Sequence, residues 1–168
     1  MGNNNSDYTI IRVTPTLSTD AYGVGDVAFT ATEIPNAVKG NAGCAKILSS
    51  YLVCQDRDTY DLELIFTEKN TALGTINATA DISDSDFEAI GFCGAFLFQH
   101  DVGHIGSIDN VKIMKSQALT GAGEAPEPLL IQADAGSTSV YVQGIIKDGT
   151  PTFAAADDID IVLHIQYK

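Results

Sequence analysis

Two histidines and an aspartate stand close together in the stretch His100-Asp101-Val102-Gly103-His104. Imidazole nitrogens and carboxylate oxygens bind metal ions, and on a helix a spacing of four residues would bring the two rings together. Gly103 and Gly106, which follow a strand-like run, favour a loop instead. We therefore interpret His100 and His104 as solvent-exposed loop residues, with a metal site as the alternative.

Carboxylates gather in clusters that could attract calcium, a cation that prefers hard oxygen ligands on loops. None of the clusters has the spacing of the twelve-residue EF-hand loop with its central glycine. We expect turn and helix-cap roles for most of these side chains, with a calcium site as the alternative. A glycosidase would also need two carboxylates across a cleft, and no such pair can be chosen from the sequence. The clusters are Asp56, Asp58 and Asp61; Asp81, Asp84, Asp86 and Glu88; and Asp157, Asp158 and Asp160.

Other signatures of catalysis are absent from the sequence. It contains no G-x-S-x-G motif, and Gly23-Val24-Gly25 lacks the third glycine of a dinucleotide fingerprint and precedes a strand. The cysteines Cys44, Cys54 and Cys93 form no C-x-x-C pair, so we expect buried reduced thiols, with a reactive thiol or a metal ligand as alternatives. The sequence thus predicts no enzyme and no catalytic, cofactor-binding or metal-binding residue.

The charge balance excludes whole classes of partner. Among 168 residues, 22 are Asp or Glu and 9 are Lys or Arg, which gives a net charge of -13. Nucleic-acid binding requires Lys and Arg to displace counterions, so neither nucleic acid nor an anionic membrane is an expected partner. Met1 to Tyr8 lacks the basic and apolar regions of a secretory signal, and we expect synthesis in the cytoplasm.

The elements that must position these residues are mostly strands. Ile159, Ile161, Leu163, Ile165 and Tyr167 alternate with more polar neighbours, and this period of two predicts a strand. Similar short runs, separated by Gly, Asp, Asn and Pro, predict an all-β fold, an antiparallel two-sheet sandwich or jelly roll, with a closed barrel as second choice. The nine predicted strands are 8–14, 27–34, 45–54, 60–67, 92–99, 111–115, 129–133, 140–146 and 159–168.

One segment, 83–90, predicts a short helix that Ser83 could cap. We expect residues 1–7 to form a flexible N-terminal arm, residues 8–168 a single sandwich domain, and residues 120–128 an exposed loop. Ile65, Val162 and Tyr141 fall on the outward faces of their predicted strands. They should therefore leave apolar surface for interfaces with other subunits.

The order of several segments resembles that of small virion proteins of tailed bacteriophages, in particular the head decoration or cement proteins of marine phages. The likeness extends from about Asp26 to the C-terminus and consists of turn chemistry and strand pattern. The segments that carry it are Glu33-Ile34-Pro35-Asn36-Ala37-Val38, 45–54, Asp61-Leu62-Glu63-Leu64-Ile65-Phe66, Thr71-Ala72-Leu73-Gly74-Thr75-Ile76-Asn77-Ala78, 136–144 and Gly149-Thr150-Pro151-Thr152-Phe153.

This resemblance implies a non-enzymatic structural protein of the virion. Such proteins bind the major capsid protein lattice on the outer surface of the assembled head, often as dimers or trimers, and stabilise it. The family provides no catalytic residue to carry over. The alternatives are a tail, collar or fibre component of the virion and a glycan- or calcium-binding β-sandwich module.

Overall fold

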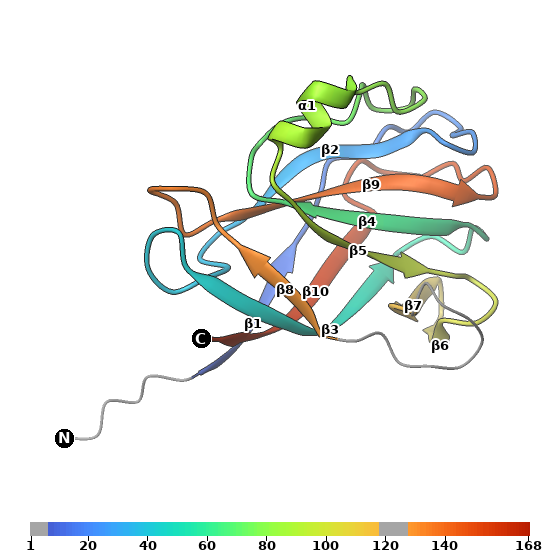
Figure 1. Cartoon of the computed structure of the whole chain (residues 1–168). Helices are drawn as coiled ribbons and strands as arrows, with labels where there is room; N and C mark the ends of the chain where they lie inside the picture. Colours follow the sequence, from blue (N-terminus) through green and yellow to red (C-terminus); the bar gives the residue numbers. More distant parts are fainter. Residues whose placement is uncertain (1–6, 118–127) are drawn as a thin grey trace.

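The computed structural model describes residues 7–117 and 128–168, and these form two antiparallel β-sheets packed face to face (Figure 1). The predicted all-β sandwich is therefore confirmed. Most of the predicted N-terminal arm and of the loop 120–128 lies outside the described residues. The elements are β1 (Tyr8–Val13), β2 (Val27–Ile34), β3 (Cys44–Cys54), β4 (Asp61–Thr67), α1 (Asp84–Ala89), β5 (Phe92–Phe98), β6 (His104–Ile108), β7 (Val111–Lys115), β8 (Leu129–Gln132), β9 (Val140–Asp148) and β10 (Ile159–Tyr167).

The first sheet has six strands and is organised around β3. Strand β10 pairs along one side of β3, while β7 and β8 share its other side. β7 pairs with residues 51–54 of β3 and β8 with residues 44–47. β1 extends the sheet beyond β10 and β6 extends it beyond β7, so the order is β1-β10-β3-β7-β6. β1 and β10 run antiparallel, with Tyr8 opposite Gln166 and Val13 opposite Ile161.

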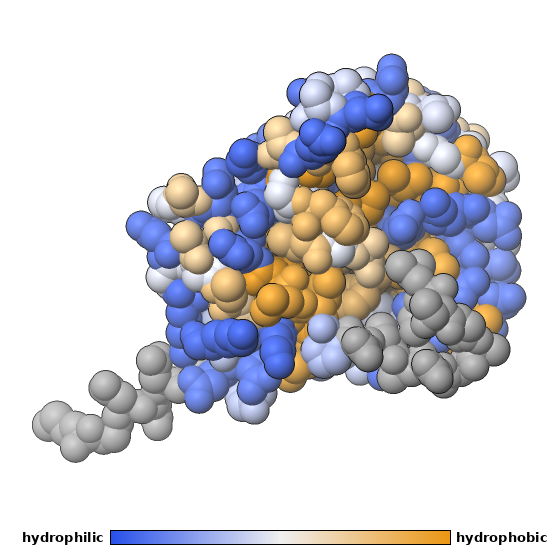
Figure 2. Space-filling model, viewed as in Figure 1, coloured by the Kyte–Doolittle hydropathy of each residue, from blue (hydrophilic) through white to orange (hydrophobic). Residues whose placement is uncertain are grey.

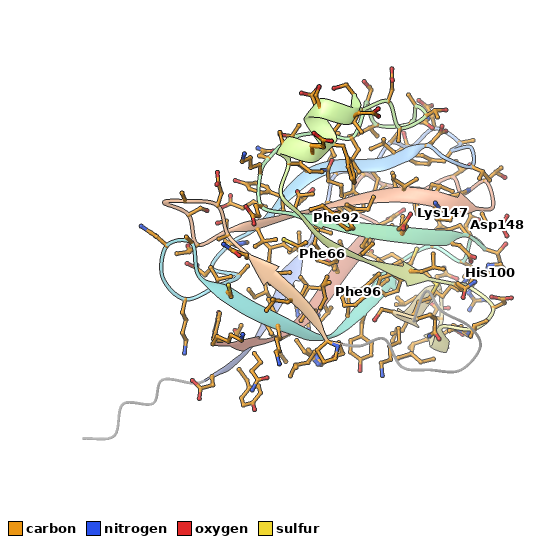
Figure 3. The ribbon with its side chains drawn as sticks, viewed as in Figure 1. Phe66, Phe92, Phe96, His100, Lys147 and Asp148 are labelled. Carbon is orange, nitrogen blue, oxygen red and sulfur yellow. The ribbon has the colours of Figure 1, made fainter. Side chains whose placement is uncertain are left out.

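The second sheet has four strands in the order β2-β9-β4-β5. Its inner residues meet those of the first sheet in one core, as the alternation of apolar side chains predicts. Ile159, Ile161 and Leu163 of β10 are fully buried there. Phe66 and Phe96 pack edge to face across β4 and β5, with ring centroids 5.6 Å apart (Figure 3). Aromatic pairs in this geometry gain more than their buried area alone provides.

A covering segment, residues 68–91, lies over the outer face of the four-stranded sheet and carries α1 (Figure 1). Leu73 and Ile90 from this segment pack on Ile65 of β4, which is only 8% exposed. The expectation that Ile65 leaves apolar surface exposed is therefore wrong. Its side chain does point outward, but the covering segment buries it in a second, smaller hydrophobic cluster.

A buried glutamine fixes the covering segment to the sheet beneath it. Gln143 of β9 is fully buried, and its side-chain Oε1 accepts a hydrogen bond of 2.9 Å from the backbone N–H of Leu73. Its Nε2 donates a bond of 2.8 Å to the carbonyl oxygen of Thr71. One amide thereby satisfies two backbone groups of a segment that has no strand partner at these positions.

The predicted helix and its cap are confirmed. α1 is a short helix, and the hydroxyl of Ser83 accepts a hydrogen bond of 3.2 Å from the backbone N–H of Asp86. Ser83 thus satisfies one of the backbone donors that a helix leaves free at its first turn. The acidic side chains of Asp84 and Asp86 lie in that first turn, where the helix dipole favours negative charge.

Two further details differ from the sequence prediction. The stretch 104–108 forms an additional edge strand, β6, although Gly106 lies in its middle. Val162, expected to be exposed on β10, is only 7% exposed, because it lies between the longer side chains of Arg12 and Tyr51 in the register of the sheet. Tyr141, the third residue expected to point outward, is half-buried.

Candidate functional site

A cleft of about 290 Å³ opens at one end of the sandwich, where the loop between β3 and β4 meets the end of β5 and the β6–β7 hairpin. The side chain of Arg57 crosses this end and donates a hydrogen bond to the carbonyl oxygen of Asp109 at the hairpin turn. The lining residues are Arg57, Thr59, His100, His104, Ser107 and Lys112.

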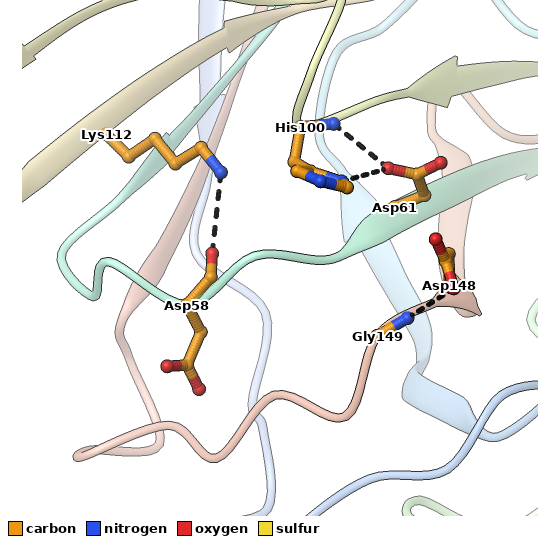
Figure 4. A network of polar contacts seen from close by, with 6 residues as sticks. All are labelled: Asp58, Asp61, His100, Lys112, Asp148 and Gly149. Atoms are coloured by element: carbon orange, nitrogen blue, oxygen red, sulfur yellow. Dashed lines mark hydrogen bonds and ion pairs between the residues drawn. The ribbon is translucent and has the colours of Figure 1, made fainter.

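The histidines of the motif 100–104 both line this cleft, but they differ in setting. His100 is half-buried, and the carboxylate oxygen Oδ1 of Asp61 accepts hydrogen bonds from its backbone N–H (3.0 Å) and from its ring Nδ1 (2.9 Å; Figure 4). The Asp61 side chain is 13% exposed. His104 begins β6 and is exposed. The prediction of two solvent-exposed loop histidines is therefore confirmed only in part. His100 does lie in a turn but is half-buried against Asp61, and His104 is exposed but lies in a strand.

The potential metal ligands near this cleft are a different set from the one that the spacing of the motif suggested. Within the described part of the chain, one group of three or more such residues is found: Asp61, His100 and Asp101, whose ligand atoms lie within 4.8 Å of one another. His104 does not belong to it. Because Asp61 is far from the motif in sequence, only the pairing of β4 with β5 brings it to His100.

Four residues of this cleft, Arg57, Thr59, Ser107 and Lys112, were not candidates from the sequence, and Lys112 is the most buried of them. It lies on the inward side of β7, opposite Cys54 of β3, and is only 7% exposed. Its Nζ donates a hydrogen bond of 3.5 Å to the carbonyl oxygen of Asp58. Burial lowers the pKa of Lys112, while the charges around it act in the opposite direction. In β7, Lys112 and Met114 share one face and Ile113 and Lys115 the other, so the alternation alone could not identify the inward face.

Tyr60 and Cys54 lie behind the cleft and are fully buried. The Tyr60 hydroxyl has no well-formed hydrogen bond to any described residue, and the neighbouring Cys54 thiol is a poor partner. Burial raises the pKa of Tyr60 well above its usual value and also raises the pKa of Cys54. A thiol with a raised pKa is a weak nucleophile, as expected for a cysteine that packs as a small apolar residue.

Three of the clustered acidic side chains accept hydrogen bonds from backbone N–H groups, in keeping with the turn roles expected for them. Asp56 accepts hydrogen bonds from the backbone N–H groups of Arg57 and Ala154. Asp58 accepts one from Thr152, and Asp158 accepts one from Ala155. These carboxylates stabilise the loops at the same end of the sandwich as the cleft.

A second feature is the outer face of the six-stranded sheet. Residues that point away from the core here include Tyr8 (59% exposed), Ile10 (61%), Leu48 (38%) and Leu130 (49%). A groove of about 380 Å³ runs between β1, β10 and β3 on this side, lined by Tyr8, Thr9, Ile10, Leu48, His164 and Ile165. His164 of β10 bonds through Nδ1 to the Ser49 hydroxyl at 2.9 Å.

This outer face differs from the rest of the protein in charge. The charged residues at its outward positions are Arg12, Lys46 and Lys115, with Asp160 as the one acidic residue among the described strands. The face therefore carries a net positive charge in a chain with a net charge of -13.

Another apolar area is visible over β5 and β8, below α1 (Figure 2). Phe92 of β5 is 52% exposed and lies beside Phe87 of α1, with ring centroids 5.8 Å apart. The four-stranded sheet thus has an exposed aromatic pair near its edge. This pair is a second exposed apolar area, separate from the outer face of the six-stranded sheet.

Comparison of the chain with protein-family models, with curated proteins and with solved structures found no match. In the described residues, the one helix is far too short to cross a membrane.

Proposed function

We propose that this protein is a non-enzymatic structural component of a bacteriophage virion, which binds the outer surface of the assembled capsid and stabilises it. The partner is the lattice of the major capsid protein, and the binding unit is a dimer or trimer of this chain. The resemblance of the segments between Asp26 and the C-terminus supports the family, and the observation that carries the binding role is the outer face of the six-stranded sheet.

The outer face has the properties of a docking surface. Tyr8, Ile10, Leu48 and Leu130 offer apolar side chains that a partner would remove from water, at about 25 cal/mol for each Å² buried. Arg12, Lys46 and Lys115 surround them with positive charge. The complementary surface is therefore partly apolar and carries carboxylates.

Weak contacts of this kind are sufficient on a repeating scaffold. A protein that binds the assembled lattice and not the free subunit stabilises the lattice by mass action. An oligomer that engages several neighbouring sites gains effective concentration without any new contact. No bond-making step is needed for the proposed role.

Cosedimentation with undecorated capsids tests the proposal. Wild-type protein should pellet with the capsids and be released by salt, since charge contributes to the contact. Ile10→Asp and Leu130→Asp place a negative charge on the outer face and should weaken binding at least tenfold. Phe92→Asp, on an aromatic of the other sheet whose exposure (52%) lies between those of Leu130 (49%) and Ile10 (61%), is the matched control and should change binding less than twofold.

Two results would contradict the proposal. Wild-type protein that stays in the supernatant at every capsid concentration would refute capsid binding. An equal loss of capsid binding in Phe92→Asp and in Ile10→Asp would refute the outer face as the binding surface. Imaging of labelled virions then locates the protein, because a head component coats the facets whereas a tail or collar component marks a single vertex.

A further inference from the structure

The end cleft brings cationic and imidazole side chains together in an acidic protein. The chain has only two arginines, seven lysines and three histidines against 22 acidic residues, yet Arg57, Lys112, His100 and His104 all line this one cleft. The other two lining residues, Thr59 and Ser107, carry hydroxyl groups. None of the lining side chains is acidic or apolar, and all are of types that can donate hydrogen bonds, although the Nδ1 of His100 already bonds to Asp61.

Lys112 is the centre of this arrangement because little of its side chain is exposed and it forms no ion pair with a described carboxylate. Among the described residues, no carboxylate lies within 4.0 Å of its Nζ, and its hydrogen bond to the Asp58 carbonyl is long at 3.5 Å. The carboxylate of Asp58 points away from the ammonium group (Figure 4). A partly desolvated ammonium without an ion-pair partner is unfavourable, and an anion bound beside it would relieve that cost.

The carboxylates near the cleft are hydrogen-bonded to other groups and form no ion pair with Lys112, although the charges of Asp58 and Asp61 still favour its ammonium form. Asp61 accepts both hydrogen bonds from His100. Asp56 accepts two backbone N–H groups, and Asp58 accepts the N–H of Thr152. The guanidinium of Arg57 is held by the Asp109 carbonyl and likewise forms no ion pair with a described carboxylate.

We propose that this cleft binds a tetrahedral oxyanion such as a phosphate group, held by Lys112 and Arg57 with the Thr59 and Ser107 hydroxyls and the two imidazoles around it. Guanidinium and ammonium groups form charge-assisted hydrogen bonds with phosphate oxygens, and hydroxyl donors complete the shell. The volume of about 290 Å³ exceeds what inorganic phosphate needs, so a phosphate ester also fits. This site lies apart from the outer face and does not depend on capsid binding.

Titration with inorganic phosphate at constant ionic strength tests the site, with binding measured by calorimetry. Lys112→Met keeps the length of the apolar stem and removes the charge, and it should weaken phosphate binding at least tenfold. Lys69→Met is the matched control, since Lys69 is an exposed lysine of the covering segment and does not line the cleft. It should change the affinity less than twofold.

Mapping the amide signals of the wild-type protein by NMR locates the site without relying on any variant. Phosphate should shift the signals of residues 57–59, 107 and 112, and chloride at the same ionic strength should not. No saturable binding, shifts confined to other regions, or equal affinity in Lys112→Met and wild type would each overturn the proposal. A glycerol phosphate titration distinguishes the sources: tighter binding than inorganic phosphate indicates a phosphorylated ligand, and equal or weaker binding indicates the free ion.

Discussion

Gln143→Leu tests how strongly the covering segment depends on a single side chain. The substitution keeps the approximate size of the residue but removes the acceptor for the Leu73 N–H and the donor for the Thr71 carbonyl. Each buried group left without a partner costs about 1–3 kcal/mol. We therefore expect the free energy of unfolding to fall by about 2–5 kcal/mol. For a domain of this size that corresponds to a fall in Tm of roughly 5–15 °C.

Urea unfolding monitored by circular dichroism measures this loss, with the midpoint falling and the slope unchanged if folding stays two-state. Gln132→Leu is the matched control, because Gln132 lies on β8 with an exposed side chain. Its effect should stay within about 0.5 kcal/mol. Hydrogen exchange of the Leu73 amide should also become faster in Gln143→Leu. A loss below about 0.5 kcal/mol, with the Leu73 amide still protected, would refute the anchoring role of Gln143.

Two further substitutions test the core. Gly144→Ala would place a methyl group 2.4 Å from a ring carbon of the fully buried Phe29, so we expect a loss of about 1–3 kcal/mol by urea unfolding. Gly106→Ala, which meets open space, should be nearly neutral, and equal effects would contradict the packing argument. Tyr60→Phe should be neutral or slightly stabilising near pH 7, because it removes a buried hydroxyl without a good partner. The raised pKa of Tyr60 means that the folded protein keeps the phenol proton while the unfolded chain loses it above pH of about 10, so wild-type stability should fall with rising pH there. The stability of the Tyr60→Phe protein should fall less steeply with rising pH. Identical stability profiles of the two proteins against pH would show that Tyr60 does not titrate on unfolding.

Most strands of this chain could be predicted from the sequence, because one face of each lies in the core and its apolar residues alternate with more polar ones. β10 shows this most clearly, since its inward residues are all apolar and its outward residues are mostly polar. The helix cap was also predictable, because Ser83 and Asp86 interact over three residues. β6 was missed because its Gly106 breaks the pattern and its side chains are largely exposed, so no apolar alternation marks it.

Contacts between distant segments could not be derived from the sequence. Ile65 was correctly placed on the outward side of β4, but nothing in a strand pattern shows that residues 68–91 fold back over it. The end cleft depends on the register that sets Lys112 opposite Cys54 and on the loop that carries Arg57 to Asp109. The histidine motif was noticed for its spacing, whereas its main partner, Asp61, is 39 residues away.

The antiparallel pairing of β1 with β10 also determines how the protein responds to force. Tyr8 lies opposite Gln166, so the first strand begins and the last strand ends at the same corner of the sandwich (Figure 1). Tension applied between the two ends would unzip this pair one hydrogen bond at a time from the Tyr8 side, instead of shearing all of its bonds together. The corner is thus the mechanically weak point of the fold, and a tether attached there would yield at low load while the rest of the sandwich stays intact.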